Sequence, residues 1–299
     1  MRHLLSIEEL GRADIERILA ASLPMKRERG RHAHRPLAGQ TWSLIFSKSS
    51  TRTRVSFKVG IHELGGNGIF LNANDLQLGR GEPVKDTARV LGRMTHGAVI
   101  RTYAQTEVEE FAEYSGIPTI NALTDEEHPC QILTDLFTVE ERLGSIRGRV
   151  LTFVGDGVSN VARSWMFAAA RLDFELRIAA PAAFQPAEDF RRQVGGRVLC
   201  FDDVREAACG ADVLYTDVWV SMGKEEESRE RTAQLEGYQI NGALVDLARP
   251  GALVMHCLPA YRGKEIDEAT FEAHATTIFD QAENRLHVQK AILEWLVTA

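Results

Sequence analysis

The amino-acid sequence predicts an α/β protein made of two doubly wound, mostly parallel-sheet domains. Its 299 residues exceed what one hydrophobic core usually holds, which indicates two domains. Short apolar runs alternate with amphipathic helical patterns in both halves, as expected when crossover helices join parallel strands. Gly144 and Gly148 interrupt this alternation near the middle of the chain. We therefore expect one domain over residues 1–143 and a second over residues 144–283.

The first half is expected to begin with a helix and then to alternate strands with helices. We expect the strands at residues 42–46, 68–71, 98–100 and 119–122, and the helices at residues 7–23, from 51 onward, 84–94 and 129–143. A basic connector over residues 26–35 joins the first helix to the first strand. Pro129 suits the start of the last helix, because proline is well tolerated at a first helical position.

The second half repeats this pattern, which predicts a second open sheet. Its strands are expected at residues 150–154, 176–179, 213–216, 253–256 and 277–279. A C-terminal helix over residues 284–299 is expected to pack back on the first domain. Ligands of such sheets bind beyond the carboxyl ends of the strands, and the candidate functional residues follow strand ends repeatedly.

Composition excludes several classes of partner and indicates a cytoplasmic protein. The net charge of -7 argues against nucleic acid or an anionic membrane as the main partner. We find no stretch apolar enough to span a bilayer, and the first residues turn acidic too early for a secretory signal. The four cysteines show neither metal-type spacing nor a disulfide pattern, which favours a reducing compartment.

Residues 50–54, Ser-Thr-Arg-Thr-Arg, form the most informative stretch. They follow an apolar strand and open an amphipathic helix, so three hydroxyls and two guanidiniums gather at a helix N-terminus. Free backbone N–H groups and the helix dipole favour an anion there, and arginine matches phosphate oxygens in a bidentate manner. The alternative is a Ser or Thr cap with solvated arginines. Five donors in five positions favour a phosphate site.

Polar residues at other expected strand and helix ends are further candidates. His128 and Gln131 lie one helical turn apart and can both donate to one carbonyl oxygen, although a histidine near a helix start is commonly a cap or a packed side chain. Asp217 and Cys257 each follow a strand, and a thiol at that place can act as nucleophile, base or orienting group. Asn160 can offer its amide to a polar substrate or cap a helix.

Gly155-Asp156-Gly157 after a strand suggests a dinucleotide fingerprint, but Asn160 occupies the third glycine position. Glu175, the acid about twenty residues further on, begins its strand instead of ending it. The sequence therefore argues against a nicotinamide-dependent dehydrogenase.

Five separated motifs resemble those of the ornithine carbamoyltransferases, within the aspartate/ornithine carbamoyltransferase superfamily. They are residues 50–54, 75–82, 128–131 (His-Pro-Cys-Gln), 217–223 and 256–259 (His-Cys-Leu-Pro), in the order of the family. The resemblance runs nearly from end to end. The chain departs from the family pattern at Val158-Ser159, which leaves the register of that turn open, and at Tyr261, which removes no expected catalytic group.

The resemblance implies that the first domain binds carbamoyl phosphate, the second binds L-ornithine, and the active site lies in the cleft between them. The implied carbamoyl phosphate contacts are Ser50, Thr51, Arg52, Thr53, Gln77, Arg101, His128, Gln131, Cys257, Leu258 and Arg285. The implied ornithine contacts are Asn160, Asp217, Ser221 and Met222. Gln77 matches a position that such enzymes offer from a neighbouring subunit of a homotrimer.

The implied reaction is direct transfer of the carbamoyl group to the δ-amine of L-ornithine, giving citrulline and phosphate. The residues expected to carry it are Cys257, Asp217, Arg52, His128 and Arg285. Asp217 with Cys257 would hold and orient the amine, and the other three would stabilise charge on the carbamoyl oxygen. No metal, cofactor or covalent intermediate is required. Because sequence does not separate anabolic from catabolic enzymes, the direction within arginine metabolism stays open.

Two alternatives remain. Related enzymes act on aspartate, acetylornithine or putrescine, but the Ser-Met-Gly loop at residues 221–223 and Cys257 favour ornithine. A catalytically silent paralogue serving as a regulatory subunit would have no need of Cys257 and Asp217 together.

Overall fold

The chain forms two compact units in a computed structural model that describes residues 1–72, 81–220 and 228–298. Unit 1 consists of Met1–Phe137 and Glu283–Ala299, and unit 2 consists of Thr138–Ala282. Each unit is built around a parallel sheet, as the sequence predicts. Within the described residues, no helix combines the length and the apolar character needed to cross a lipid bilayer.

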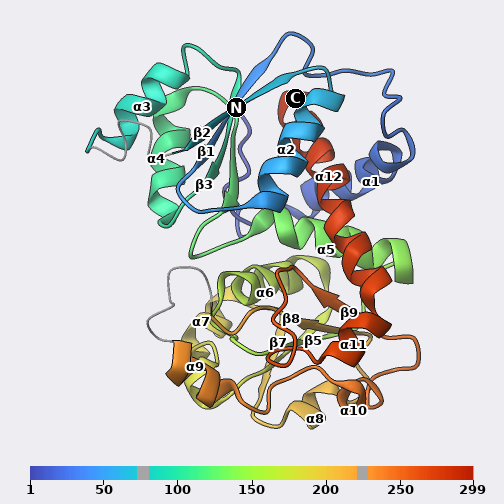
Figure 1. The fold of residues 1–299 in the computed structure, drawn as a ribbon. Helices are drawn as coiled ribbons and strands as arrows, with labels where there is room; N and C mark the ends of the chain where they lie inside the picture. Colours follow the sequence, from blue (N-terminus) through green and yellow to red (C-terminus); the bar gives the residue numbers. More distant parts are fainter. Residues whose placement is uncertain (73–80, 221–227, 299) are drawn as a thin grey trace. The chain divides into compact units, whose positions relative to one another are not determined.

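Unit 1 contains a four-stranded parallel sheet in the order β2-β1-β3-β4. The strands are β1 (Thr41–Phe46), β2 (Asn67–Asn72), β3 (Gly97–Arg101) and β4 (Thr119–Leu123). The helices are α1 (Arg12–Arg27), α2 (Thr51–Glu63), α3 (Val84–Leu91), α4 (Gln105–Ser115), the first part of α5 (Pro129–Leu143) and most of α12 (Ala275–Val297). Figure 1 shows α3 and α4 on one side of this sheet and α2 and α12 on the other.

The core of unit 1 is apolar and closely packed around β1 and β3. Trp42 is fully buried, and a Cβ atom at Gly97 on the neighbouring strand would come within 2.5 Å of its ring. Glycine is therefore required at this position, because any side chain would displace the indole. On the α3 and α4 side, a second group of apolar residues, among them Ile45, Ile100 and Phe111, excludes water from the sheet.

Unit 2 contains a five-stranded parallel sheet in the order β7-β6-β5-β8-β9. The strands are β5 (Val150–Val154), β6 (Glu175–Ala179), β7 (Arg197–Phe201), β8 (Val213–Thr216) and β9 (Leu253–His256). The helices are α6 (Asn160–Leu172), α7 (Glu188–Val194), α8 (Val204–Ala208), α9 (Ser228–Leu235), α10 (Gly242–Val245) and α11 (Glu268–Ala273). Buried aromatic rings join the sheet to α6, since Trp165 packs edge-on against Tyr215, which stacks on Phe153.

Strand order locates the place where each sheet is suited to bind a ligand. The chain reverses its direction of winding between β1 and β3 in unit 1, and between β5 and β8 in unit 2. Loops that leave such neighbouring strands diverge to opposite faces and open a crevice beyond the carboxyl ends. At the first crevice, residues 47–50 follow β1 and Arg101 ends β3. At the second crevice, residues 155–160 follow β5 and Asp217 follows β8.

Three expectations about elements are wrong. The helix expected over residues 7–23 begins only at Arg12, because residues 7–10 form a turn in which the Leu10 N–H donates to the Ile7 carbonyl, and Gly11 is the N-cap. Before that turn, Leu4 forms a parallel bridge to Ile120 on β4. The strand expected at residues 277–279 lies inside α12, which begins at Ala275 and not at residue 284. The strand β7 was not expected, since this edge strand has only one buried residue, Val198.

Candidate active site

The phosphate motif of unit 1 lies where β1 runs into α2. Ser50 caps α2, and its hydroxyl oxygen accepts a hydrogen bond from the Thr53 backbone N–H at 3.2 Å. The side chains of Thr51 and Arg52 are exposed, whereas Thr53 is buried. The cap and the anion site are therefore compatible, because capping uses one N–H group of the first turn and leaves the others directed beyond the helix end.

A pocket of about 550 Å³ adjoins this helix start. Its lining residues come from the end of β1, the start of α2 and the end of β2: Phe46, Ser47, Lys48, Ser49, Ser50, Thr51, Arg54, Val55, Phe70 and Asn72. Arg54 does not extend freely into solvent, since its guanidinium carbon lies 3.5 Å from the centre of the Phe70 ring. Lys48 is buried, forms an ion pair with Asp125 and lies 4.4 Å from the Tyr103 ring centre.

Buried polar side chains from three further elements, β3, α5 and α12, lie near the start of α2. Together with residues 50–54 they form what we call the half-site of unit 1. Arg285 on α12 donates to Gln131 Oε1 at 2.6 Å and to Thr53 Oγ1 at 3.1 Å. The structure therefore brings together α2, α5 and α12 through residues that the sequence singled out separately. Arg101 ends β3 opposite Phe46, and its carbonyl accepts from Ser47 N–H at 2.8 Å, which places it beside the phosphate motif.

His128 precedes α5 and is only 5% exposed. Burial lowers the pKa of its imidazole well below the ordinary value, and the positive charges of Arg285 and Arg101 lower it further. A neutral imidazole still offers one N–H group, so His128 can act as an uncharged hydrogen-bond donor. Gln131 donates to Asp135 Oδ1 at 2.7 Å, which fixes the orientation of its amide.

The half-site of unit 2 is built at the carboxyl ends of β8 and β9. Cys257 Sγ donates to Asp217 Oδ1 at 2.9 Å, and the Val218 backbone N–H donates to the same oxygen at 2.7 Å. Burial raises the pKa of Asp217 above its ordinary value, although His256 and both hydrogen bonds oppose this shift. A carboxylate with a raised pKa is suited to accept a proton near neutral pH.

His256 is held in one orientation by contacts at both of its ring nitrogens. Its Nδ1 accepts from the Leu258 backbone N–H at 2.8 Å, so its Nε2 carries the hydrogen that faces Glu265 Oε1 at 3.2 Å. Leu258 has a φ of 59° and is followed by a cis peptide bond to Pro259. Sequence reasoning missed Glu265, because no motif distinguishes it from the charged residues that surround it.

Asn160 is the first residue of α6, after the turn that leaves β5. Ser159, and not Asn160, caps this helix by accepting from the Ala162 N–H at 3.3 Å. The cap alternative for Asn160 is therefore wrong. The neighbouring Asp156 forms a buried ion pair with Arg231, a pairing that no sequence pattern indicated.

Comparison with known proteins identifies the family. The family model of the aspartate/ornithine carbamoyltransferase carbamoyl-P binding domain matches residues 2–141, and the model of the Asp/Orn binding domain of the same family matches residues 147–296. The chain belongs to the aspartate/ornithine carbamoyltransferase family. An ornithine carbamoyltransferase of Akkermansia muciniphila is 59% identical over 302 residues, covering 100% of this chain and 99% of that protein.

Solved structures of carbamoyltransferases share the fold over the whole chain. The ornithine carbamoyltransferase from Pyrococcus furiosus superposes with a TM-score of 0.92 at 41% identity, covering 100% of this chain and 97% of that one. The anabolic ornithine carbamoyltransferase from Campylobacter jejuni gives a TM-score of 0.92 at 39% identity, covering 99% of each chain.

Three residues that the carbamoyltransferase motifs single out, Gln77, Ser221 and Met222, lie outside the described residues. Of the residues that are described, Asp217, His256 and Cys257 bring potential metal-ligand atoms within 4.8 Å of one another. Both ring nitrogens of His256 are engaged, however, which leaves two ligands where zinc usually has three or four protein ligands. This group therefore fits proton handling better than metal binding.

Proposed function

We propose that the chain transfers the carbamoyl group of carbamoyl phosphate to the δ-amine of L-ornithine, giving citrulline and phosphate. In this proposal unit 1 holds carbamoyl phosphate and unit 2 holds ornithine. The observation that carries it is the hydrogen bond from Cys257 to Asp217, because it presents an oriented carboxylate to the acceptor. A carboxylate suits the second amine of ornithine, whereas it would repel the second carboxylate of aspartate.

The residues of unit 1 supply binding and charge stabilisation. Arg52 and Arg101, with Ser50, Thr51 and Thr53, are proposed to hold the phosphate, since arginine and the helix start both favour oxyanions. Neutral His128 and charged Arg285 are proposed to donate to the carbamoyl oxygen, with Gln131 oriented beside them. Each such donor contributes about 3 kcal/mol when it meets charge that develops in the transition state.

The reaction then proceeds by direct displacement. Asp217, with Cys257, accepts or orients the proton of the δ-ammonium, and the freed amine attacks the carbamoyl carbon. A new C–N bond forms, the C–O bond to phosphate breaks, and the leaving phosphate takes up a proton. Asn160, Ser221 and Met222 are proposed to bind the amino-acid end of ornithine, and Cys257 and Leu258 to contact the carbamoyl group. The donor is already activated, so this route requires no metal or cofactor.

A parallel assay of citrulline and related products tests this function. The purified chain is incubated with carbamoyl phosphate and, separately, ornithine, acetylornithine, putrescine or aspartate. Turnover confined to ornithine is expected. Turnover of another amine would overturn the acceptor assignment but keep the donor site. No turnover with carbamoyl phosphate bound would favour the silent regulatory paralogue.

We also propose that the protein is a cytoplasmic homotrimer in which Gln77 reaches the active site of a neighbouring subunit. Val55 on α2 and Ile69 on β2 support an interface beside the phosphate pocket, because they leave 55% and 43% of their surface exposed. The four cysteines are free thiols, as is usual in a reducing compartment. Light scattering should give three times the mass of the chain.

Mixing two inactive variants tests the shared site directly. Gln77→Ala and Arg52→Gln each inactivate their own type of trimer, but mixed trimers contain some sites with both native residues. Recovered activity after dissociation and reassociation is expected. If Gln77 and Arg52 served the active site of the same subunit, mixing the two variants would restore no activity.

A further inference from the structure

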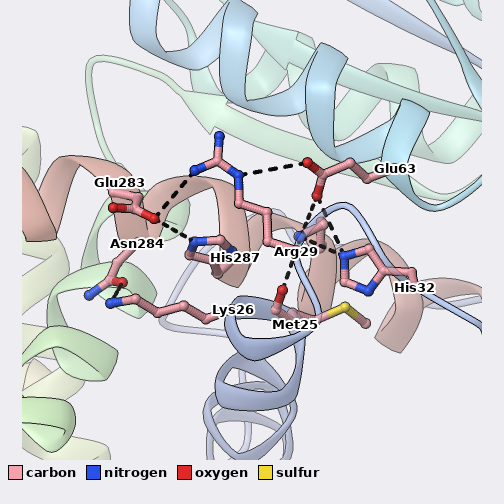
Figure 2. Close-up of polar contacts among 9 residues, drawn as sticks. Met25, Lys26, Arg29, His32, Glu63, Glu283, Asn284 and His287 are labelled. Atoms are coloured by element: carbon pink, nitrogen blue, oxygen red, sulfur yellow. Dashed lines mark hydrogen bonds and ion pairs between the residues drawn. The ribbon is translucent and has the colours of Figure 1, made fainter.

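Lys290 on α12 is a fully buried cation that lies outside the half-site of unit 1. Its Nζ donates to the Met25 carbonyl at 3.0 Å and to Glu63 Oε2 at 2.6 Å, and it lies 2.8 Å from His32 Nε2. These partners come from the end of α1, the connector that follows it and the end of α2. Figure 2 shows Met25, His32 and Glu63 converging from these three segments.

Two polar links join the helices that carry the half-site. At the start of α2, Thr53 Oγ1 accepts from Arg285 at 3.1 Å. At the end of α2, Glu63 accepts from Lys290, five residues further along α12 than Arg285. Both links join α2 to α12. The link between Lys290 and Glu63 therefore fixes the distance between these helices at which Arg285 meets Thr53.

Gly60 permits this close approach of α2 and α12. A Cβ atom at Gly60 would lie 3.2 Å from Lys290 Cγ and 3.6 Å from Leu286 Cδ1. The stem of Lys290 passes over the backbone of α2 at this point, and its three contacts at Nζ leave it little freedom to move aside. The lysine is therefore built into the packing of the two helices.

A second layer of contacts surrounds the residues next to Arg285. Lys26 donates to Asn284 Oδ1 at 2.9 Å, and Arg29 Nη1 lies 3.5 Å from Glu283 Oε1. Glu283 also lies 3.2 Å from His287 Nε2 on the next turn of α12. Figure 2 shows this layer connecting α12 to the end of α1 and the connector. The backbone of α12 is thus held on both sides of Arg285.

The attraction between Lys290 and Glu63 offsets only part of the cost of burying the lysine charge. Burial lowers the pKa of Lys290, while the hydrogen bond and charge of Glu63 oppose that shift. Burial would raise the pKa of Glu63, but Lys290, His32 and Arg29 lower it below its ordinary value. Buried ion pairs are often no more stabilising than apolar side chains of the same volume, so stability alone does not account for a lysine here.

We propose that Lys290 is a positioning residue of the carbamoyl phosphate half-site. By fixing Glu63 to α12, it sets the position at which Arg285 meets Thr53 and Gln131. This inference rests on the proposed function of the half-site. It predicts that loss of Lys290 weakens the interaction with carbamoyl phosphate and leaves the interaction with ornithine nearly unchanged.

Steady-state kinetics of the full-length Lys290→Met variant test the proposal. The KM for carbamoyl phosphate is expected to rise about tenfold, with less than about a twofold change in the KM for ornithine. Because this variant leaves the half-buried Glu63 without its lysine partner, the double variant Glu63→Gln/Lys290→Met is measured in parallel. It removes both charges, so it is expected to fold even where the single variant fails, and it is expected to keep the raised KM.

A matched core variant separates positioning from stability. Ile292 is fully buried on α12, and Ile292→Ala is expected to lower the thermal midpoint without altering either KM. If the Lys290 variants lower the midpoint in the same way and leave the KM for carbamoyl phosphate unchanged, Lys290 is merely structural and the inference fails. An equal rise of both KM values would also overturn it.

Failure of the proposed function gives a different result. If the native chain forms no citrulline, the proposed function fails, and titration calorimetry with carbamoyl phosphate then decides the inference. About tenfold weaker binding by the Lys290 variants than by the native chain would support it, and equal binding or binding by neither would overturn it.

Discussion

Cys257 and Asp217 lie side by side because the strands before them are paired in register. Thr216 at the end of β8 is opposite His256 at the end of β9, so the next residue of each parallel strand meets its counterpart. The resulting distance from Cys257 Sγ to Asp217 Oδ1 is 2.9 Å. The acceptor side of the proposed reaction is therefore set by β-sheet pairing and not by a flexible loop.

Replacing Asp217 by Asn should lower kcat/KM for ornithine by about 100- to 10,000-fold, as expected for loss of a proton-accepting group. The KM for carbamoyl phosphate should change little, since Asp217 belongs to unit 2. Asp189→Asn, a change of an exposed carboxylate in the same unit, serves as the control. Equal effects of the two substitutions on citrulline formation would contradict the role of Asp217.

Replacing Arg52 by Gln should weaken binding of carbamoyl phosphate about 100-fold, because a charged donor to the phosphate is lost. Arg52 is exposed, so the fold should be retained. Lys58→Gln removes an exposed charge from the same helix outside the phosphate motif and should leave the affinity unchanged. Calorimetry that shows native affinity for Arg52→Gln would refute the phosphate assignment.

Replacing His128 by Gln should reduce the loss of stability on acidification. The folded state keeps the pKa of His128 well below 6.5, so between that value and 6.5 the unfolded chain binds more protons than the folded one. Stability therefore rises with pH in this window and falls by about 1.4 kcal/mol for each pH unit below 6.5.

Urea denaturation at pH 7 and at pH 5 measures this difference. The His128→Gln variant lacks the titrating group, so the slope of its unfolding free energy against pH should be smaller than that of the native chain. An unchanged slope would show that His128 titrates normally in the folded state.

Replacing Gly157 by Ala should destabilise unit 2 by about 1–3 kcal/mol. The added Cβ would lie 2.4 Å from Ile178 Cγ2 and 2.7 Å from the Phe184 carbonyl oxygen. Gly242→Ala is the matched control, since nothing lies within 4 Å of a Cβ at that position, and it should be neutral or slightly stabilising. Denaturation of the two variants gives the comparison, and similar values for both would show that the turn before Asn160 can relax.

The sequence was sufficient to predict most of the fold. Eight of the nine strands found in the described part of the chain follow from short apolar runs, because buried parallel strands are nearly continuous in hydrophobicity. The edge strand β7 lacks that signal. The run at residues 277–279 carries the signal without forming a strand, since an apolar triplet suits a strand or a buried helix equally well. No glycine or proline interrupts α12 between Ala275 and Val297, and this absence indicates the helix better than the apolar triplet does.

In the candidate site, the motif residues could be predicted from the sequence more completely than the residues that hold them in position. The hydroxyls and arginines of residues 50–54 were detectable because several donors occupy adjacent positions. Glu265, Asp156 and Lys290 were not, since each is an ordinary charged residue whose role depends on partners distant in sequence. Pairing over such separations is a property of the folded chain and leaves no local pattern.

Unit 1 is discontinuous along the chain, and this has a consequence for its synthesis. A ribosome synthesises Met1–Phe137 first, then all of unit 2, and only after that Glu283–Ala299. At about 5–20 residues per second, the first segment waits roughly 10 to 30 s for the helix that completes its core. During that interval the faces of α1 and α2 that α12 covers are open to other molecules in the cell. Arg285 and Lys290 are made after all of unit 2, so the nascent chain cannot assemble the proposed donor site until unit 2 has been synthesised.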